Sequence, residues 1–367
     1  MTLHLNSTDP DFESRFVDVL SMKREQNTDV TQAAQDIIHQ VQRDGDQALY
    51  ALTEKFDRFA LSPDTLRFSV DEIASAKTRI EAADLEALAE AAKRIKAYHE
   101  RQKPSDDFYT DAAGVQLGHK WTPVGAAGLY VPGGTASYPS SVLMNAIPAK
   151  VAGVGRLVMV VPTPDGEVSD LVLAAAEMAG VDEIYRIGGA QAIAALAYGT
   201  SSIPPVDVIT GPGNAYVAAA KRLVFGQVGI DMIAGPSEIL VVADGANNPD
   251  WIAVDLLSQA EHDVAAQSIL MTDDNQFAEA VINAVDEQLE TLPRREIAGQ
   301  SWADFGVVIT VTNMEQAIGL IDRLAPEHLE LAVDDAQEMA AKITNAGAIF
   351  MGRYTPEAIG DYVAGPN

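Results

Sequence analysis

The sequence lacks cysteine altogether and is poor in basic residues. Zero cysteines exclude disulfides, thiolate zinc sites, iron–sulfur clusters and cysteine nucleophiles. Any metal must be bound by histidine, carboxylate or amide oxygen, and the chain has only six histidines. Its 53 acidic residues outnumber 25 basic ones, and the resulting net charge of −28 repels phosphate backbones and anionic lipids. We therefore expect neither nucleic acid nor a membrane as a partner.

Long apolar runs are also missing. No stretch approaches the ~18 uncharged apolar residues that a transmembrane helix needs. The first residues carry acids rather than the basic and apolar segments of a signal peptide, so we expect a cytoplasmic protein. With 367 residues, 47% of them hydrophobic and 21% charged, the chain is long enough for two or three globular domains.

The residue pattern changes along the chain. Apolar residues recur at helical spacing over residues 30–56, and a second such run extends from Val70 to about Arg101. From about Trp121 onward, short β-branched runs alternate with alanine-rich helical segments. Uncharged strands separated by helices are typical of parallel sheets covered on both faces. The sequence predicts two α/β units, with functional loops at the carboxyl ends of the strands.

No standard glycine fingerprint for dinucleotides is present. Gly211–Asn214 follows a predicted strand and precedes a helix, a context that offers backbone N–H groups to a phosphate. However, Pro212 lacks an N–H and the spacing is not GxGxxG, so a plain turn is the commoner explanation. Ser237 lies in another turn rich in small residues. No histidine lies two or three residues away to activate it, which favours a substrate contact over a nucleophile.

A predicted helix at residues 250–262 places Gln259 and His262 on one face, where both side chains can bind one ion. Glutamine is an uncommon metal ligand, and a capped helix end with a solvated histidine is the commoner arrangement. Glu327 and His328 form a candidate acid/base pair. The alternative is that Pro326 and Glu327 simply open a helix. Asp361 beside a glycine is most often a turn residue.

Together these segments resemble one family, the L-histidinol dehydrogenases. The motifs that carry the resemblance, in the family's order, are GLYVPGGTASYPSSVLMNAIPAKVAGV from Gly128, IGGAQAIAALAYGT from Ile187, GPGNAYVAAAKR from Gly211, GIDMIAGPSE from Gly229, LLSQAEHD from Leu256, APEHLEL from Ala325 and GDYVAGPN from Gly360. The similarity extends from about residue 20 to the last residue.

The resemblance implies roles for individual residues. Gln259, His262 and Asp361 match ligands of a catalytic zinc ion, and with Ser237 and His328 they match substrate contacts. Glu327 and His328 match the family's acid/base pair. The positions that match NAD contacts are Tyr130, Gln191 and Asn214. The implied reaction is the NAD-dependent oxidation of L-histidinol to L-histidine through L-histidinal, which ends histidine biosynthesis.

The resemblance also implies an architecture. It predicts two incomplete Rossmann-like domains with parallel sheets, the second inserted in the first, plus N-terminal helices and a homodimer. On this basis we expect an arm at residues 1–25, a first domain at residues 26–129 and 238–367, and a second domain at residues 130–237.

One departure from the family pattern affects the site. Family chains continue beyond this motif with a substrate-contacting histidine, a glutamate and a fourth zinc ligand, and we expect that C-terminal domain to be absent from these 367 residues. We therefore expect this chain by itself to bind zinc poorly. The alternatives are a related zinc and NAD dehydrogenase of another small alcohol, such as a sulfopropanediol, or an inactive truncated form. A non-catalytic scaffold is the alternative from another class.

Overall fold

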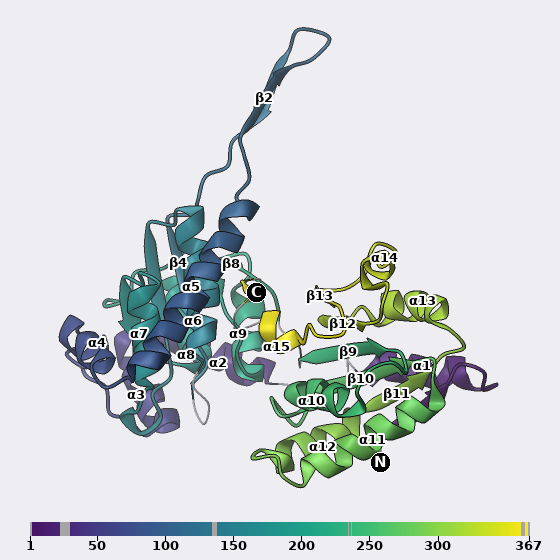
Figure 1. The fold of residues 1–367 in the computed structure, drawn as a ribbon. Helices are drawn as coiled ribbons and strands as arrows, with labels where there is room; N and C mark the ends of the chain where they lie inside the picture. Colours follow the sequence, from purple (N-terminus) through teal and green to yellow (C-terminus); the bar gives the residue numbers. More distant parts are fainter. Residues whose placement is uncertain are drawn as a thin grey trace. The chain divides into compact units, whose positions relative to one another are not determined.

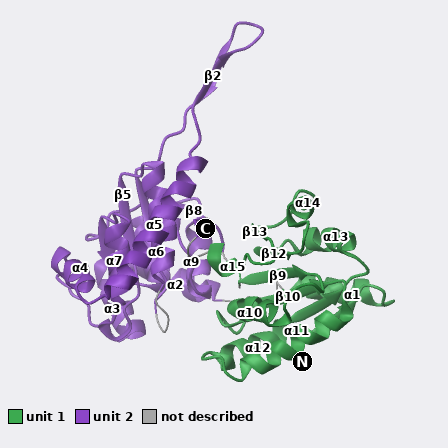
Figure 2. Cartoon of the chain, viewed as in Figure 1, with its two compact units in different colours: residues 1–27, 235–360 green, residues 28–234, 361–367 purple. Residues whose placement is uncertain are grey.

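The computed structural model describes residues 2–22, 30–133, 138–233, 235, 237–360 and 364–365. The chain forms two compact units (Figure 2). Unit 1 comprises residues 1–27 and 235–360, and unit 2 comprises residues 28–234 and 361–367. No helix in the described ranges is long and apolar enough to cross a membrane. The predicted α/β class is confirmed, as is the insertion of the second unit within the first.

Unit 1 is built on one six-stranded parallel sheet (Figure 1). In spatial order its strands are β1 (Leu3–Asn6), β11 (Val307–Thr310), β10 (Gln267–Thr272), β9 (Glu238–Ala243), β12 (His328–Ala332) and β13 (Ala348–Met351). Its helices are α1 (Phe12–Met22), α10 (Pro249–Ala260), α11 (Asn275–Leu289), α12 (Arg295–Phe305), α13 (Met314–Leu324), α14 (Ala336–Ala340) and α15 (Glu357–Ile359).

Both faces of this sheet are apolar, as the uncharged strand sequences predict. Along β9, Leu240 packs into one core with residues of α1 and α13, whereas Val241 packs into a second core with residues of α10, α11 and α12. This alternation follows from the two-residue period of a strand, which sends successive side chains to opposite faces.

Unit 2 contains a five-stranded parallel sheet and a separate antiparallel hairpin. In spatial order the sheet strands are β6 (Glu183–Tyr185), β5 (Arg156–Val160), β4 (Ala126–Tyr130), β7 (Val208–Thr210) and β8 (Gly229–Ile230), and the hairpin strands are β2 (Asp107–Thr110) and β3 (Gln116–His119). Its helices are α2 (Thr31–Asp44), α3 (Asp46–Asp57), α4 (Val70–Lys77), α5 (Ala82–Gln102), α6 (Pro139–Ala152), the 3-10 turn η1 (Pro164–Gly166), α7 (Asp170–Met178), α8 (Gly189–Tyr198) and α9 (Ala215–Val224).

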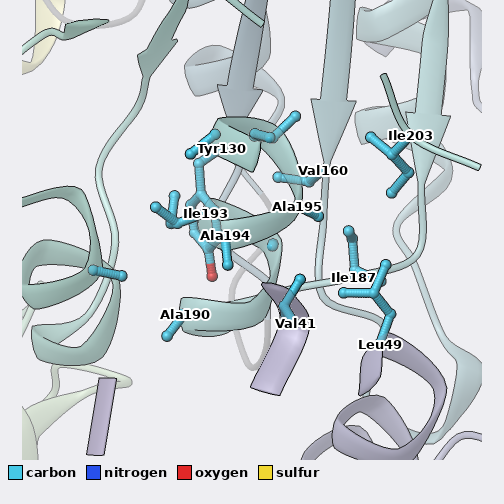
Figure 3. Close-up of a cluster of buried hydrophobic side chains, with 14 of the residues drawn as sticks. Val41, Leu49, Tyr130, Val160, Ile187, Ala190, Ile193, Ala194, Ala195 and Ile203 are labelled. Carbon is cyan, nitrogen blue, oxygen red and sulfur yellow. The ribbon is translucent and has the colours of Figure 1, made fainter. Parts of the chain in front are cut away.

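The cores of unit 2 explain why the expected domain boundaries need correction. Val41 and Leu49, from α2 and α3, pack with Ile193 of α8 on one face of the sheet (Figure 3). On the other face, Ile95 of α5 packs with Leu143 of α6. Residues 28–129 therefore group with the second unit. We had expected residues 26–129 to belong to the first domain. Residues 28–129 bring β4, the central strand of the unit 2 sheet.

Two further expectations are corrected by packing. Residues 1–25 are not simply an arm, because β1 pairs in parallel with β11 and Phe16 is fully buried in the core of unit 1. The helical run from Val70 to Arg101 divides into α4 and α5. The division occurs where Thr78 caps α4, its hydroxyl donating to the Ser75 carbonyl.

Candidate active site

The predicted acid/base pair lies at the amino end of a strand, not at a helix opening. His328 is the first residue of β12, and Glu327 immediately precedes it. The Glu327 carbonyl accepts a hydrogen bond from the Ala348 N–H at 2.9 Å. Gly347 makes this close approach possible, because a Cβ there would lie 2.6 Å from the Glu327 carbonyl oxygen. The neighbouring segment therefore fixes the backbone of the pair.

The His328 ring is largely enclosed, with 14% of its side chain exposed. Its Nδ1 lies 3.2 Å from Oε1 of Gln259 and 3.6 Å from Oε1 of Glu357. The Phe350 ring meets it edge-on, with 6.1 Å between the ring centroids. Residues from β12, β13, α10 and α15 thus converge on one imidazole, and only tertiary packing brings them together.

The predicted pair of metal-type donors lies at the carboxyl end of α10. Nε2 of Gln259 is 3.5 Å from Nδ1 of His262, as the i,i+3 spacing predicts. Gln259 is buried with 1% exposure, whereas His262 is exposed. Among the described residues, no three histidine, aspartate or glutamate side chains gather as a metal-binding cluster. Asp361, the third expected ligand, lies outside the described residues.

Glu327 and Ser237 are close to each other in the fold. Oε2 of Glu327 accepts a hydrogen bond of 3.2 Å from the backbone N–H of Glu238, the residue after Ser237. The Ser237 carbonyl accepts the N–H of Gln267 at 3.0 Å, which holds this residue at the start of β9. The two predicted residues therefore flank the amino ends of adjacent strands.

This location corrects the expectation of functional loops at the carboxyl ends of the strands in both units. In unit 1, Ser237, Glu327 and His328 all lie at the amino edge of the sheet. α10 follows β9 and returns antiparallel to it, so its carboxyl end, with Gln259, reaches the same edge. The usual crevice of open α/β sheets is at the opposite edge.

A cluster of two buried carboxyl groups and one half-buried carboxyl group next to His328 went unnoticed in the sequence. It consists of Asp255 on α10, Glu330 on β12 and Glu357 on α15. Burial, followed by the charges of Asp255 and Glu357, raises the pKa of Glu330 to about 9, and burial raises the pKa of Asp255 to about 6. A charged residue inside the otherwise apolar strand HLELA was the available signal.

The three residues expected to contact NAD lie at the carboxyl edge of the sheet in unit 2. Tyr130 ends β4, Asn214 precedes α9 after β7, and Gln191 is buried in the first turn of α8. Because β4 connects onward to β5 on one side and pairs with β7 on the other, the strand order reverses here. Such a reversal is the usual ligand site of an open α/β sheet.

Some polar groups at this edge are already engaged in hydrogen bonds. The Gly189 N–H donates to the Tyr130 hydroxyl at 3.0 Å, and burial raises the pKa of Tyr130 to about 12, so the phenol is neutral at pH 7. Oδ1 of Asn214 accepts the N–H groups of Tyr216 and Val217. The Gly211–Asn214 turn is therefore a helix cap, and these two N–H groups are already used.

A buried ion pair fixes the Gly211 turn. The Lys221 ammonium, 2% exposed as a residue, donates to the Gly211 carbonyl at 2.9 Å and pairs with Asp231. Asp231 also accepts the Gly211 N–H at 2.8 Å. Gly211 has φ +111° and a Cβ there would lie 2.1 Å from the Tyr130 carbonyl oxygen, so only glycine fits. Sequence reasoning missed both charged residues, although they lie within the quoted motifs.

The fold is that of a two-unit α/β protein, with the predicted acid/base residues in one unit and the predicted NAD contacts in the other. A family model described as histidinol dehydrogenase matches residues 20–367. The chain belongs to the histidinol dehydrogenase family and is an oxidoreductase of histidine biosynthesis.

Individual proteins support this assignment. The histidinol dehydrogenase of Ruegeria pomeroyi is 65% identical over 367 residues, which cover 100% of this chain and 85% of that protein. The enzyme of Rhodospirillum rubrum is 63% identical over 368 residues with the same coverage. The crystal structure of histidinol dehydrogenase from Elizabethkingia anophelis matches with a TM-score of 0.94 and 35% identity, covering 100% of this chain and 84% of that one.

Proposed function

We propose that this protein oxidises L-histidinol to L-histidine through L-histidinal, reducing two NAD. The observation that carries the proposal is the juxtaposition at one sheet edge of His328, Glu327 and the Gln259 amide, the last within 3.2 Å of the His328 ring. Oxidising an alcohol and then an aldehyde hydrate requires a base for each oxygen-bound proton, and this edge provides two candidate groups.

In the first oxidation, His328 accepts the proton of the alcohol hydroxyl, and bound NAD would be the acceptor of the hydride from the same carbon. In the second, Glu327 accepts a proton from the water that adds to the aldehyde carbon, the former aldehyde oxygen takes up a proton to complete the hydrate, and a second NAD would accept the hydride of that hydrate. The exposed Glu327 carboxylate faces solvent water, whereas His328 is largely enclosed. Ser237 would contact the substrate beside them.

We assign Gln259, His262 and Asp361 to a zinc ion. The amide nitrogen of Gln259 lies 3.5 Å from Nδ1 of His262, so the two side chains are adjacent, and His nitrogen is a preferred zinc ligand. When bound, zinc would orient the substrate by binding the substrate's imidazole and amine nitrogens. Gln259 lies in the last turn of α10 and His262 two residues beyond the end of that helix.

We assign Tyr130, Gln191 and Asn214 to NAD. Their placement at the strand reversal of the unit 2 sheet supports this assignment. The Lys221–Asp231 pair would keep the Gly211 turn fixed while cofactor enters and leaves.

We further propose that the protein works as a homodimer in the cytoplasm, where NAD and biosynthetic intermediates are found. All eight residues of β2 and β3 are exposed. Large apolar side chains there include Phe108, 70% exposed, with Trp121 just beyond at 59%. Exposed apolar groups of this size mark interaction surfaces. Sedimentation of the protein and of a Phe108→Ser, Trp121→Ser variant tests this, since the variant is expected to dissociate.

The experiment that tests the reaction is the stoichiometry of NADH formation by the full-length protein. A limiting amount of L-histidinol should yield two NADH per molecule, with little free histidinal. One NADH per molecule would contradict the two-step assignment and indicate a simple alcohol dehydrogenase. A matched incubation with a sulfonated propanediol separates the histidinol activity from that of a related enzyme.

A further inference from the structure

The residues that we assign to NAD in unit 2 lie on both sides of the carboxyl end of strand β5. In space β5 lies between β6, after which α8 carries Gln191, and β4, which ends at Tyr130. The Tyr130 hydroxyl accepts the Gly189 N–H at 3.0 Å, so the segments on the two sides meet at this edge. A ligand that touches both Gln191 and Tyr130 therefore passes the carboxyl end of β5.

In dinucleotide-binding sheets, the end of the second strand is the place that distinguishes NAD from NADP. In chain order β4, β5 and β6 are the first three strands of this sheet, and they lie in the spatial order third, second, first, followed by β7. In sheets of this order an acidic residue binds the ribose 2′-hydroxyl of NAD, whereas a nearby arginine accommodates the 2′-phosphate of NADP. Here Val161, Pro162 and Thr163 follow β5, and none of them is charged. Any charge that selects the cofactor must come from another segment.

Asp57, the last residue of α3, supplies a negative charge at this position. The residue is 8% exposed, and its Oδ2 has no hydrogen-bond partner among the described residues. Burial raises the pKa of the Asp57 carboxyl, and the Thr163 N–H and the charge of Arg58 act in the opposite direction by favouring the anion. Beyond burial, the charge of Asp57 also raises the pKa of Tyr130, so its electric field reaches the Tyr130 hydroxyl.

Arg58 is the cation beside this turn, and Asp165 occupies it. The Nε and Nη2 groups of Arg58 donate to the two carboxylate oxygens of Asp165 at 2.7 and 2.5 Å. Both residues have a left-handed backbone with φ of 56°, and Phe59 packs against Gly166, where a Cβ would lie 2.9 Å from the ring. The bidentate pair uses the two N–H groups with which an arginine would bind a phosphate.

The arginine that follows β6 is engaged as well. Arg186 is 7% exposed, and its guanidinium lies over the Phe68 ring, 3.5 Å from the ring centroid. It donates to the carbonyls of Thr65 and Arg67 and pairs with the Glu72 carboxylate. Neither arginine is therefore available to a phosphate group at the end of β5.

We propose that Asp57 and Asp165 determine the choice of cofactor: the charge of Asp57 repels the 2′-phosphate of NADP, and Asp165 withholds the Arg58 guanidinium from it. This inference rests on the proposed NAD site in unit 2. Specificity often depends on such repulsion of the wrong ligand, in addition to attraction of the right one. The two aspartates act on binding and take no part in the oxidation.

The test compares adenosine 5′-monophosphate with adenosine 2′,5′-bisphosphate, which differ only in the 2′-phosphate. Titration calorimetry of the full-length protein, without substrate, gives the dissociation constant of each. We expect the wild type to bind the monophosphate about tenfold or more tightly than the bisphosphate, because like charges brought together oppose association. Equal affinity for the two, or tighter binding of the bisphosphate, would overturn the proposal.

Variants of the two aspartates should reduce or reverse this preference. Asp165→Asn releases Arg58 and should strengthen bisphosphate binding about tenfold, with little change for the monophosphate. Asp57→Asn preserves the shape of the side chain and should act in the same direction, and the double variant should prefer the bisphosphate. Arg58→Gln in the Asp165→Asn background should cancel the gain. Because Asp165 is exposed, Asp165→Asn decides the outcome even if Asp57→Asn fails to fold. An unchanged affinity ratio in Asp165→Asn would refute the proposal.

Asp170→Asn is the matched control. Asp170 makes the same kind of bidentate pair with an arginine of unit 2, accepting from Nε and Nη2 of Arg79 at 2.8 and 2.5 Å. Its affinity ratio should remain that of the wild type. A shift equal to that of Asp165→Asn would mean that net charge alone governs the preference, and would overturn the assignment to the end of β5.

Kinetics separate this proposal from the proposed reaction. The ratio of KM for NADP to KM for NAD, measured with histidinol, should fall about tenfold or more in the double variant. A wild type that oxidises histidinol with NAD, but whose affinity ratio is the same in every variant, would reject the role of the two aspartates alone. A wild type that binds neither adenosine phosphate would reject the NAD site, and this inference with it.

Discussion

The two units contain the same kind of parallel sheet but place their candidate residues at opposite edges. In unit 2, Tyr130 and Asn214 lie at the carboxyl edge, and both are neutral groups bonded to backbone N–H groups. In unit 1, Glu327 and His328 lie at the amino edge, beside a cluster of carboxyls. The comparison shows that the α/β architecture does not by itself determine at which edge the candidate residues lie.

The hydrophobic cores of the two units also differ, in whether they contain ionisable groups. Helix α8 of unit 2 is almost wholly buried and consists largely of alanine, so the helix can approach the sheet closely. In unit 1, Asp255 and Glu330 occupy positions that face a core, at a desolvation cost that appears as raised pKa values. Unit 2 is built for close packing around a binding edge, and unit 1 tolerates ionisable groups inside.

The largest expected effect comes from removing the base in unit 1. His328→Asn should lower the rates of both oxidations by about 10²–10⁴-fold, since each requires proton removal from an oxygen. NAD affinity, which we assign to unit 2, should stay within twofold when measured by fluorescence titration. His39→Asn, on an exposed face of α2, is the control. Equal damage to NAD binding would remove the functional distinction between the units.

Glu327→Gln should act selectively on the second oxidation. We expect oxidation of histidinal to fall about 10²–10³-fold, because water is no longer activated, with a much smaller loss for histidinol. Stopped-flow measurement of each step separates the two. Glu338→Gln, exposed on α14, is the matched control. An unchanged histidinal rate would show that Glu327 is not the base for water.

In unit 2, Gly211→Ala should weaken NAD binding and stability together. The comparison variant is Gly226→Ala, whose φ of +102° imposes similar backbone strain but whose Cβ would meet nothing within 4 Å. Such strain costs about 1–3 kcal/mol. Gly211→Ala should lower the free energy of unfolding, measured in urea, by more than this, because its Cβ overlaps the Tyr130 carbonyl. For the same reason it should raise KM for NAD. Equal effects of the two substitutions would mean that the close approach is unimportant.

The last expected effect is the pH dependence of folding stability caused by Glu330. Its pKa of about 9 lies above the ordinary 4.5, so between these values the folded chain keeps a proton that the unfolded chain releases. The contribution of Glu330 to the free energy of unfolding therefore decreases as pH rises across that window. Glu330→Gln does not titrate and should become progressively more stable than the wild type from pH 5 to pH 8.5.

Thermal or urea unfolding at several pH values measures this difference. Glu279→Gln, on the exposed side of α11, should track the wild type throughout. A difference between Glu330→Gln and the wild type that is constant with pH would contradict a buried, protonated Glu330.

Much of the fold and of the site was predictable from local pattern. The strands at residues 156–160 and 238–243 were recognisable as uncharged β-branched runs, and the i,i+3 spacing alone placed Gln259 beside His262. These features depend on the fixed periods of strands and helices, which short-range sequence specifies directly. The motif order likewise sufficed to indicate the family.

Only the tertiary structure decided the rest. No local pattern indicates that Glu357, 29 residues beyond His328, reaches its imidazole, or that Asp255 and Glu330 lie together. Nor did it show that residues 28–129 belong with unit 2, a grouping fixed by which apolar faces pack against β4. Contacts between distant segments depend on the complementarity of whole surfaces. The place at which a charged group is desolvated depends on the same complementarity. The local periodicity of the sequence determines neither the contacts nor this place.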